Sequence, residues 1–400
     1  MTDWVWVVGG GRIQEPLIRE YVARGFKVCV GDKDPMCWAT RLSGEGLPVE
    51  VYMVDTHDSH SQLEVVKSVA QGTPGAPGFP RIPPSPPRAV MTAGTDVGPT
   101  VSLIAETFNL PGVPYDVAYE VKSKPIMRQL VDTLHPWWST RKPLEYPCVE
   151  KPWGSSGSKG VKVLWSDRDF KFKQGFLWEE YLQPHVEAST DWMMDGGYPV
   201  YVNGAWRWFD DDTFGLEVGW VNPFVLEPGV QDLAIRASRR LGVQEGPFKM
   251  DILRDKQYGW TLLECATRWS GSFDHTVGAT LSTGRNLSAA LVDYSLGLSF
   301  DPKYGFSQAT IHQYAGAYTP PLKGEWKVTE EMLQSIKEEP GVVDVIPLRW
   351  SGGTVTTLAE RPLFIFGVGS SIGSVRDVTQ RGWLRWREVE RTVNLGGGGE

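Results

Sequence analysis

Two lysines and a glycine-rich loop are the first residues whose types and spacing could do chemistry. Residues 150–163 read EKPWGSSGSKGVKV, so that Lys151 directly precedes a run of small residues, and Lys124 lies upstream on a predicted basic helix. Lysine ammonium groups can neutralise phosphates as mobile point charges. Glycines let backbone N–H groups close around phosphate oxygens without a steric penalty. Alone, such a loop is more often a solvated hairpin, and Lys124 alone is a surface lysine.

Acidic residues at predicted strand ends extend this pattern. Glu179 and Glu180 end one predicted strand, whereas Asp251 and Glu264 lie on two predicted neighbouring strands, with Arg268 shortly after them. A strand-end carboxylate can accept hydrogen bonds from a ribose or from the adenine amine, and paired carboxylates suit Mg²⁺, which prefers oxygen ligands. Each residue alone would be an exposed strand end or half of an ordinary ion pair. Their joint order indicates a Mg-ATP site.

The elements that must position these residues begin with a small parallel α/β domain over residues 1–114. A strand, a glycine turn, a helix and a second strand are predicted over residues 4–32, followed by a helix over residues 59–70. The glycines at residues 9–11 lack the third glycine of the dinucleotide-binding motif, which favours a structural turn. Asp32 could hold a ribose or cap that turn. Residues 73–88 are too rich in proline and glycine for regular structure.

Three further units are expected after this domain. Residues 115–185 form a basic helix and a strand–loop–strand hairpin, the predicted lid. Residues 186–300 form antiparallel strands, a helix near residues 230–241 and the two strands with the acidic residues. Residues 301–400 form a further small α/β module. The expected fold class is therefore a multidomain mixture of α/β and α+β units.

Composition excludes several classes of protein. The chain has 400 residues, a formal charge of −8 and 41% hydrophobic residues. Such an acidic chain is a poor candidate for a general nucleic-acid or membrane-surface binder. Cys29, Cys37, Cys148 and Cys265 form no CxxC pair, which favours reduced thiols over a disulfide framework or a zinc site. With no signal peptide or membrane span predicted, we expect a cytoplasmic protein.

The sequence also resembles the ATP-grasp superfamily, in particular its carbamoyl-phosphate-synthase-like ligases. The resemblance covers residues 3–297 and rests on WVVGGGRIQEPLIREYVARGFKVCVGDKDP near the start, on TAGTDVGPTVSLIAETFNLPGVPYDVAYEVKSKPIMRQL, and on the ordered site residues. It implies a pre-domain, a lid subdomain, a β-rich metal-binding subdomain and a C-terminal appendage, with ATP bound between the lid and the metal-binding subdomain.

The resemblance implies a role for each matching residue. ATP phosphates would be bound by Lys124 and Lys151, under a mobile lid that includes Trp153, Ser155, Ser156, Gly157, Ser158 and Gly160. The adenine hinge would comprise Glu179, Glu180, Tyr181 and Leu182, and the ribose would be bound by Glu187. Mg²⁺, with Mn²⁺ as an alternative ion, would be held by Asp251 and Glu264. Catalysis would fall to Lys151 and Arg268, which stabilise the phosphoryl group in transfer.

Enzymes of this kind usually activate a carboxylate as an acyl phosphate, which an amine then attacks. The expected partners are thus a small carboxylate and a small amine, and a homodimer is one assembly that the sequence allows. One departure from the family pattern Glu-x-Asn-x-Arg is Ala266, which cannot supply an amide oxygen to a metal. Asp274 is a candidate replacement. A non-catalytic nucleotide-binding module, a carboxylase that uses carboxyphosphate and a phosphate-transfer enzyme therefore remain alternatives.

Overall fold

The fold was analysed in a computed structural model. It describes residues 3–72, 84–154, 157–183, 186–210, 214–319, 324–326, 328–348, 353–355, 361 and 363–396. Most of the proline-rich segment at residues 73–88 lies outside these ranges. Within them, no helix is both long and apolar enough to traverse a bilayer. All four cysteines are buried and free, as the sequence predicts.

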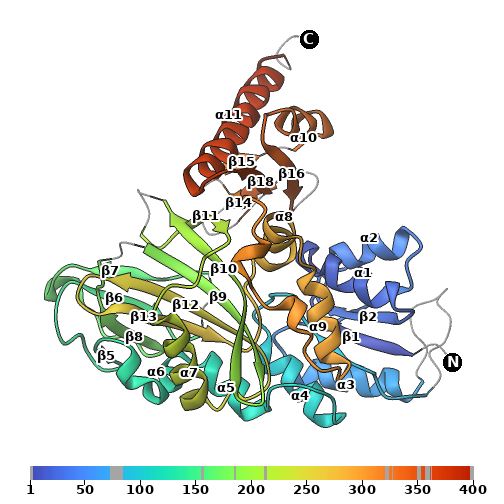
Figure 1. Cartoon of the computed structure of the whole chain (residues 1–400), viewed down its shortest axis with the longest axis horizontal. Helices are drawn as coiled ribbons and strands as arrows, with labels where there is room; N and C mark the ends of the chain where they lie inside the picture. Colours follow the sequence, from blue (N-terminus) through green and yellow to red (C-terminus); the bar gives the residue numbers. More distant parts are fainter. Residues whose placement is uncertain are drawn as a thin grey trace.

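The N-terminal domain is a parallel sheet with the strand order β3-β2-β1-β4, flanked by helices (Figure 1). Its strands are β1 (Trp4–Val8), β2 (Lys27–Asp32), β3 (Val49–Met53) and β4 (Val90–Met91). Its helices are α1 (Glu15–Ala23), α2 (Trp38–Gly44), α3 (Ser59–Ala70) and α4 (Gly98–Thr107). Every residue of β1 is buried, as expected of a parallel strand covered on both faces.

The glycine turn after β1 is held by Asp32. The Gly10 N–H donates to Asp32 Oδ2 at 2.6 Å, and the Asp34 N–H donates to Asp32 Oδ1 at 2.9 Å. Gly9 has φ +97°, a conformation that glycine adopts without a Cβ penalty. The favoured interpretation of this segment as a structural turn therefore agrees with the structure.

The lid contains two helices and a four-stranded antiparallel sheet with the order β5-β8-β6-β7. Its elements are α5 (Tyr115–Lys122), α6 (Lys124–Leu130), β5 (Trp138–Ser139), β6 (Cys148–Pro152), β7 (Lys162–Leu164) and β8 (Phe176–Glu180). The single basic helix expected here is two helices, because Pro125 has no N–H with which to continue α5 and instead occupies the first turn of α6. The predicted hairpin around the glycine loop is present as β6 and β7.

One eight-stranded antiparallel sheet forms the rest of the scaffold, in the order β13-β12-β9-β10-β11-β14-β18-β16. Its first five strands are β9 (Val186–Asp195), β10 (Tyr198–Phe209), β11 (Glu217–Asn222), β12 (Gly246–Asp255) and β13 (Gly259–Ala266). The last three come from the C-terminal quarter: β14 (Tyr314–Tyr318), β16 (Val342–Pro347) and β18 (Leu363–Gly369). The boundary expected between residues 300 and 301 therefore divides a continuous sheet.

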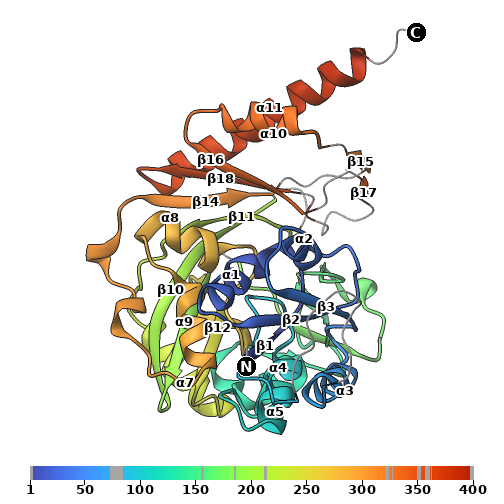
Figure 2. The same cartoon turned by 90° about the vertical axis from the view of Figure 1, so that its right-hand side faces the viewer.

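Helices cover this sheet along its length. They are α7 (Val230–Leu241), the π-helical turn η4 (Asp274–Gly278), α8 (Ala279–Thr283), α9 (Leu287–Ser295), α10 (Glu330–Lys337) and α11 (Ile372–Gly396). The short strands β15 (Gly324–Trp326) and β17 (Gly353–Val355) form a separate pair. Figure 2 shows α10 and α11 outside β14, β16 and β18, with α11 projecting beyond the body of the protein.

The junction between the two parts of the sheet requires Gly316. A Cβ at this position would lie 2.4 Å from the Trp220 carbonyl oxygen on β11 and 2.8 Å from Val375 Cγ1 on α11. We therefore expect Gly316→Ala to lower the free energy of unfolding by about 1–3 kcal/mol, measured by urea denaturation.

Gly373→Ala is the matched control, because its nearest side-chain atom would be Ser371 Oγ at 3.9 Å. Inside a helix, alanine is favoured over glycine by up to about 1 kcal/mol. Equal stability of the two variants would contradict tight packing at the junction.

Candidate functional site

A cleft of about 300 Å³ separates the lid from the eight-stranded sheet. Its walls come from α4, α5, α6, the lid strands and β9 to β13, so that all the segments expected to bind ATP meet there. The predicted site residues that line it are Lys124, Lys151, Gly157, Ser158, Glu179, Glu180, Leu182, Glu187, Asp251, Glu264 and Arg268. Apolar side chains from both walls, Val149 and Leu253 among them, also face it, as is common in small-molecule pockets.

Three predicted residues lie outside this lining. Trp153 is 39% exposed, and its backbone N–H donates to the Gly175 carbonyl oxygen. Tyr181 packs against the rings of Trp165 and Phe214. Gly160 has φ +77° and adjoins Pro152. In this structure, none of the three lines the cleft, whereas Ser155 and Ser156 lie outside the described residues.

Glu179 is the most heavily paired acid of the site. Its carboxylate is 2% exposed and lies 2.5 Å from both Arg128 Nε and Lys151 Nζ, with His135 Nε2 at 3.8 Å. Burial opposes ionisation of Glu179, but Arg128 and Lys151 hold its pKa well below the ordinary value. Burial and Arg128 lower the pKa of His135 to about 3, so this histidine is neutral. The Glu179 side chain expected at the adenine hinge is thus the centre of a buried ion-pair cluster.

Arg128 connects this cluster to the opposite wall. One of its terminal nitrogens donates to the Leu263 carbonyl oxygen on β13, directly before Glu264. The guanidinium therefore joins α6, β8 and β13, and its partner Glu179 also pairs with Lys151.

Asp251 and Glu264 face each other across β12 and β13. Their Cα atoms are register partners, and both side chains are partly exposed to the cleft. Asp251 Oδ2 lies 2.7 Å from Lys249 Nζ, and Glu264 Oε1 lies 2.9 Å from Lys124 Nζ. Two carboxylates at one level of a ladder are hard oxygen donors of the kind that Mg²⁺ binds, so the donor set fits this ion.

Glu187 occupies the start of β9 beside these acids. Burial and the neighbouring Asp251 carboxylate raise the pKa of Glu187 to about 8, and Lys151 only partly offsets them. Glu187 is therefore largely protonated at neutral pH. A protonated carboxyl can donate as well as accept a hydrogen bond, which suits a hydroxyl-bearing ligand.

The other end of the cleft carries several cations. Arg268 Nη1 donates to the Trp269 carbonyl oxygen, while Arg268 Nε lies 3.6 Å from Asp96 Oδ1. Among the described residues, no hydrogen-bond acceptor pairs with this buried Nε atom. Arg361, from the C-terminal segment, donates to Ser272 Oγ and also lines the cleft. This end is chemically suited to an anionic group.

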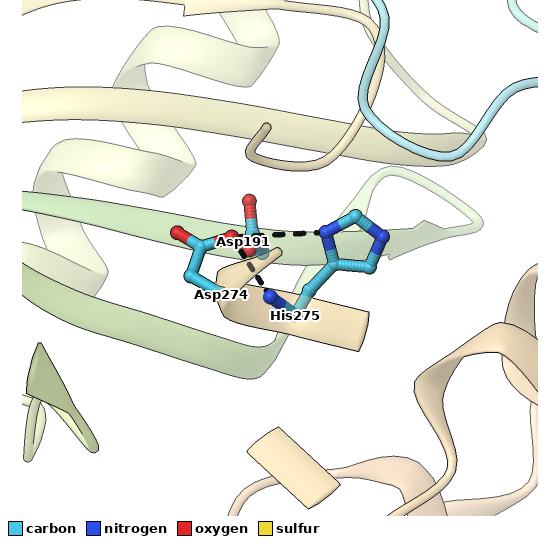
Figure 3. Close-up of side chains that lie close together, drawn as sticks. All are labelled: Asp191, Asp274 and His275. Carbon is cyan, nitrogen blue, oxygen red and sulfur yellow. Dashed lines mark hydrogen bonds and ion pairs between the residues drawn. The ribbon is translucent and has the colours of Figure 1, made fainter. Parts of the chain in front are cut away.

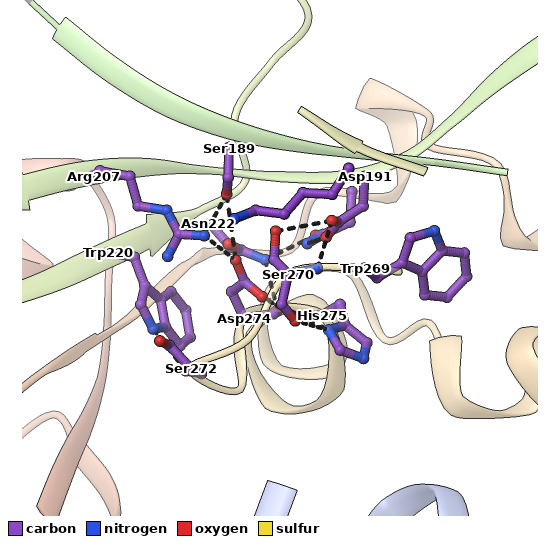
Figure 4. A network of polar contacts seen from close by, with 12 residues as sticks. Ser189, Asp191, Arg207, Trp220, Asn222, Trp269, Ser270, Ser272, Asp274 and His275 are labelled. Atoms are coloured by element: carbon purple, nitrogen blue, oxygen red, sulfur yellow. Dashed lines mark hydrogen bonds and ion pairs between the residues drawn. The ribbon is translucent and has the colours of Figure 1, made fainter. Parts of the chain in front are cut away.

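A buried polar network holds the loop that carries Arg268. Asp191, Asp274 and His275 have potential ligand atoms within 4.8 Å of one another (Figure 3). Both carboxylates, however, already accept hydrogen bonds from other residues of the protein. Asp191 accepts from the Ser270 N–H and hydroxyl, and Asp274 accepts from Arg207 (Figure 4).

The two carboxylates of this network have opposite pKa shifts. Burial and Asp274 raise the pKa of Asp191, whereas Arg207 outweighs burial and lowers the pKa of Asp274. The His275 ring contacts the Ser270 carbonyl oxygen through Nδ1 at 2.6 Å. The network therefore fixes residues 270–275. Asp274, the candidate replacement for the missing amide, does not line the cleft.

Some cleft residues were not singled out from the sequence. Arg128 follows Lys124 by four positions, the spacing of one helix face, and Lys249 precedes Asp251 by two, the spacing of one strand face. Those periods are signals that could have identified both. No local pattern marks Arg207, Glu217 or Arg361, which long-range sheet pairing brings to the cleft.

Removal of the Glu179 charge should lower the stability of the folded protein. In Glu179→Gln, the nearby cations lose their buried counter-charge, and we expect the protein to lose about 3–5 kcal/mol of stability, measured by urea denaturation. Glu145→Gln is the control, because Glu145 is an exposed acid of the same lid. A loss no larger than the control's would refute the role of Glu179 as the centre of the cluster.

The raised pKa of Glu187 predicts a pH dependence. Its folded-state pKa lies above the ordinary value, so wild-type stability falls as the pH rises between the two values, while a glutamine avoids this cost. We expect Glu187→Gln to gain at least about 1 kcal/mol relative to wild type between pH 5 and pH 9. Urea denaturation at both pH values tests this expectation, and a stability difference that is independent of pH would contradict it.

Comparison with solved structures reveals the fold. No family profile matches the sequence, and no curated protein sequence matches it significantly. An L-amino acid ligase from Bacillus licheniformis superposes with a TM-score of 0.76 and 18% identity, over 96% of this chain and 97% of that one.

Two other similar structures are synthetases whose names give other compounds. N5-carboxyaminoimidazole synthetase from Staphylococcus aureus, in complex with ADP, gives a TM-score of 0.71 at 12% identity, over 96% and 98% of the two chains. Phosphoribosylglycinamide synthetase from Anaerococcus prevotii gives 0.67 at 12% identity, over 94% and 96%. Because the likeness spans nearly the whole of each chain, this protein has the ATP-grasp fold.

Proposed function

We propose that this protein is an ATP-dependent ligase that joins a carboxylate to an amine and releases ADP and phosphate. The observation that carries the proposal is the convergence of Lys124, Lys151, the facing Asp251–Glu264 pair and Arg268 on one cleft. If Lys151 were only a surface residue of a hairpin, and Asp251 and Glu264 only exposed strand ends, nothing would require their side chains to meet in one cleft. The similar structures include several ligases, which supports the same class of reaction.

The nucleotide end of the cleft binds ATP in this proposal. Lys151 and Lys124 contact its phosphates, and the backbone of Gly157 and Ser158 lies over them. Both of these residues line the cleft and have positive φ, and backbone N–H groups in turns of this kind can bind anions. Asp251 and Glu264 hold Mg²⁺, which neutralises charge on the phosphate oxygens when it is bound.

The reaction proceeds in two displacements. A carboxylate oxygen of the first substrate attacks the γ-phosphorus, the bond to the β,γ-bridging oxygen breaks, and ADP leaves. Arg268 and Lys151 stabilise the charge on the phosphoryl oxygens in transfer. The amine nitrogen of the second substrate then attacks the acyl carbon. The bond from carbon to phosphate breaks, phosphate leaves, and the nitrogen loses a proton.

The carboxylase alternative is favoured by one specific observation, since N5-carboxyaminoimidazole synthetase is among the similar structures. Such an enzyme would need bicarbonate in place of an organic carboxylate. Phosphate release that depends on added bicarbonate, in buffer otherwise free of it, would select this alternative over the proposed one.

Phosphate release from Mg-ATP tests the function directly. Pools of carboxylates and amines are added, with amino acids first, because one similar structure is an L-amino acid ligase. We expect equal amounts of ADP and phosphate, formed only when both pools are present. Mass spectrometry identifies the joined product, and subdivision of the pools identifies the two substrates.

Variants locate the activity in the cleft. Arg268→Met should lower kcat by about 100-fold or more, the usual loss for a removed transition-state donor, while ATP still raises the melting temperature. Lys151→Ala should weaken both effects, and Lys171→Ala, at an exposed lid position, should change neither. Full activity of Arg268→Met would refute its role. ATP binding without turnover on any pool would favour the non-catalytic module.

A further inference from the structure

Lys249 and Ala266 lie directly beside the two carboxylates expected to bind metal. Lys249 is the register partner of Ala266, just as Asp251 is the partner of Glu264. Since side chains two apart on a strand share a face, the carboxylate pair and the Lys249–Ala266 pair form two successive levels on one face. Both levels line the cleft, and the intervening Met250 and Cys265 are buried.

The Lys249 ammonium lies among acidic groups. It is 2.7 Å from Asp251 Oδ2, and its side chain is only 13% exposed. Its charge also influences the pKa of Asp96, another residue that lines the cleft. Burial would raise the pKa of Asp96, but Arg268, Lys122, Lys124 and Lys249 together hold that pKa below its ordinary value. The ammonium therefore supplies positive charge where several carboxylates converge, which is also what a bound cation does.

Ala266 leaves room for this arrangement. Its methyl group offers no lone pair to a metal, and it is too short to contact an ion held between Asp251 and Glu264. A larger amide at this position would compete with the Lys249 side chain for the same level of the ladder. The small Ala266 side chain and the Lys249 ammonium therefore occupy the same level of the ladder, with no metal ligand at residue 266.

We propose that the Lys249 ammonium takes the electrostatic place of a second metal ion, so that the cleft binds a single divalent ion with each nucleotide. The inference rests on the nucleotide-binding part of the proposed function. An ammonium donates hydrogen bonds to phosphate oxygens and neutralises one charge, and it needs no ligand from Ala266. The site then depends less on the concentration of free metal than a two-ion site would.

Manganese binding measures the number of ions without reference to turnover. Wild-type protein is saturated with a non-hydrolysable ATP analogue and titrated with Mn²⁺, while free Mn²⁺ is followed by electron paramagnetic resonance. We expect one tightly bound Mn²⁺ per chain, with the spectrum of an isolated ion. Two bound ions, or a spectrum broadened by coupling between neighbouring ions, would overturn the proposal.

A paired substitution should reverse the arrangement. In Lys249→Ser combined with Ala266→Asn, the ammonium is removed and an amide oxygen is provided, and we expect a second Mn²⁺ to bind. Lys256→Ser is the matched control, because Lys256 is exposed in the turn of the same hairpin, and it should keep a single ion. A single ion in the paired variant, with nucleotide still bound, would contradict the proposal.

The ammonium itself is tested by Lys249→Met. We expect at least about a tenfold lower kcat, partly restored in Lys249→Arg, which keeps the charge. Full activity of Lys249→Met would overturn the proposal. A single bound Mn²⁺ with no ligation on any substrate pool would support the charge substitution and reject the ligase function, so the two failures are distinguishable.

Discussion

The buried ion-pair cluster of Glu179 is the constraint on which the cleft depends. A carboxylate with almost no access to water is tolerated only with counter-charges, and here Arg128 and Lys151 supply them from α6 and β6. Arg128 also donates to the backbone of β13, so the acid at the centre of the lid cluster is connected to the strand that carries Glu264. Lys151 is consequently held in place by Glu179, an arrangement that in the proposed function would lower the ordering cost of binding a phosphate.

Local charge compensation recurs throughout the site, although the chain as a whole is acidic. Glu264 pairs with Lys124, Asp251 with Lys249, and Arg207 with Asp274. These pairs differ in burial, and that difference separates their roles. The Arg207–Asp274 pair is almost inaccessible to solvent and fixes a loop, whereas the pairs of Glu264 and Asp251 are more exposed and line the cleft.

Local sequence patterns predicted much of this arrangement. The helices at residues 59–70 and 230–241 have the predicted bounds, because apolar periodicity and, for the first, the Asp58 cap define them within a few residues. The glycine hairpin and the adjacency of Asp251 and Glu264 followed from short connections. The pairing of β14, β16 and β18 did not, because alternation reveals a strand but not its neighbour in a sheet. For the same reason Arg361 could not be assigned to the cleft.

The continuous sheet has a consequence for how this chain can change over evolution. Its C-terminal strands extend the sheet whose other strands carry Asp251 and Glu264, and the same segment brings Arg361 into the cleft lining. Substitutions there can alter the cleft lining around Arg361 without directly contacting the Glu179 cluster, because Glu179 belongs to a different sheet. Exchange of residues 301–400 as a block would, by contrast, disrupt the pairing of β11 with β14 in the interior of the sheet. In this architecture the cleft lining can change by single substitutions, whereas replacement of the whole C-terminal part destabilises the sheet.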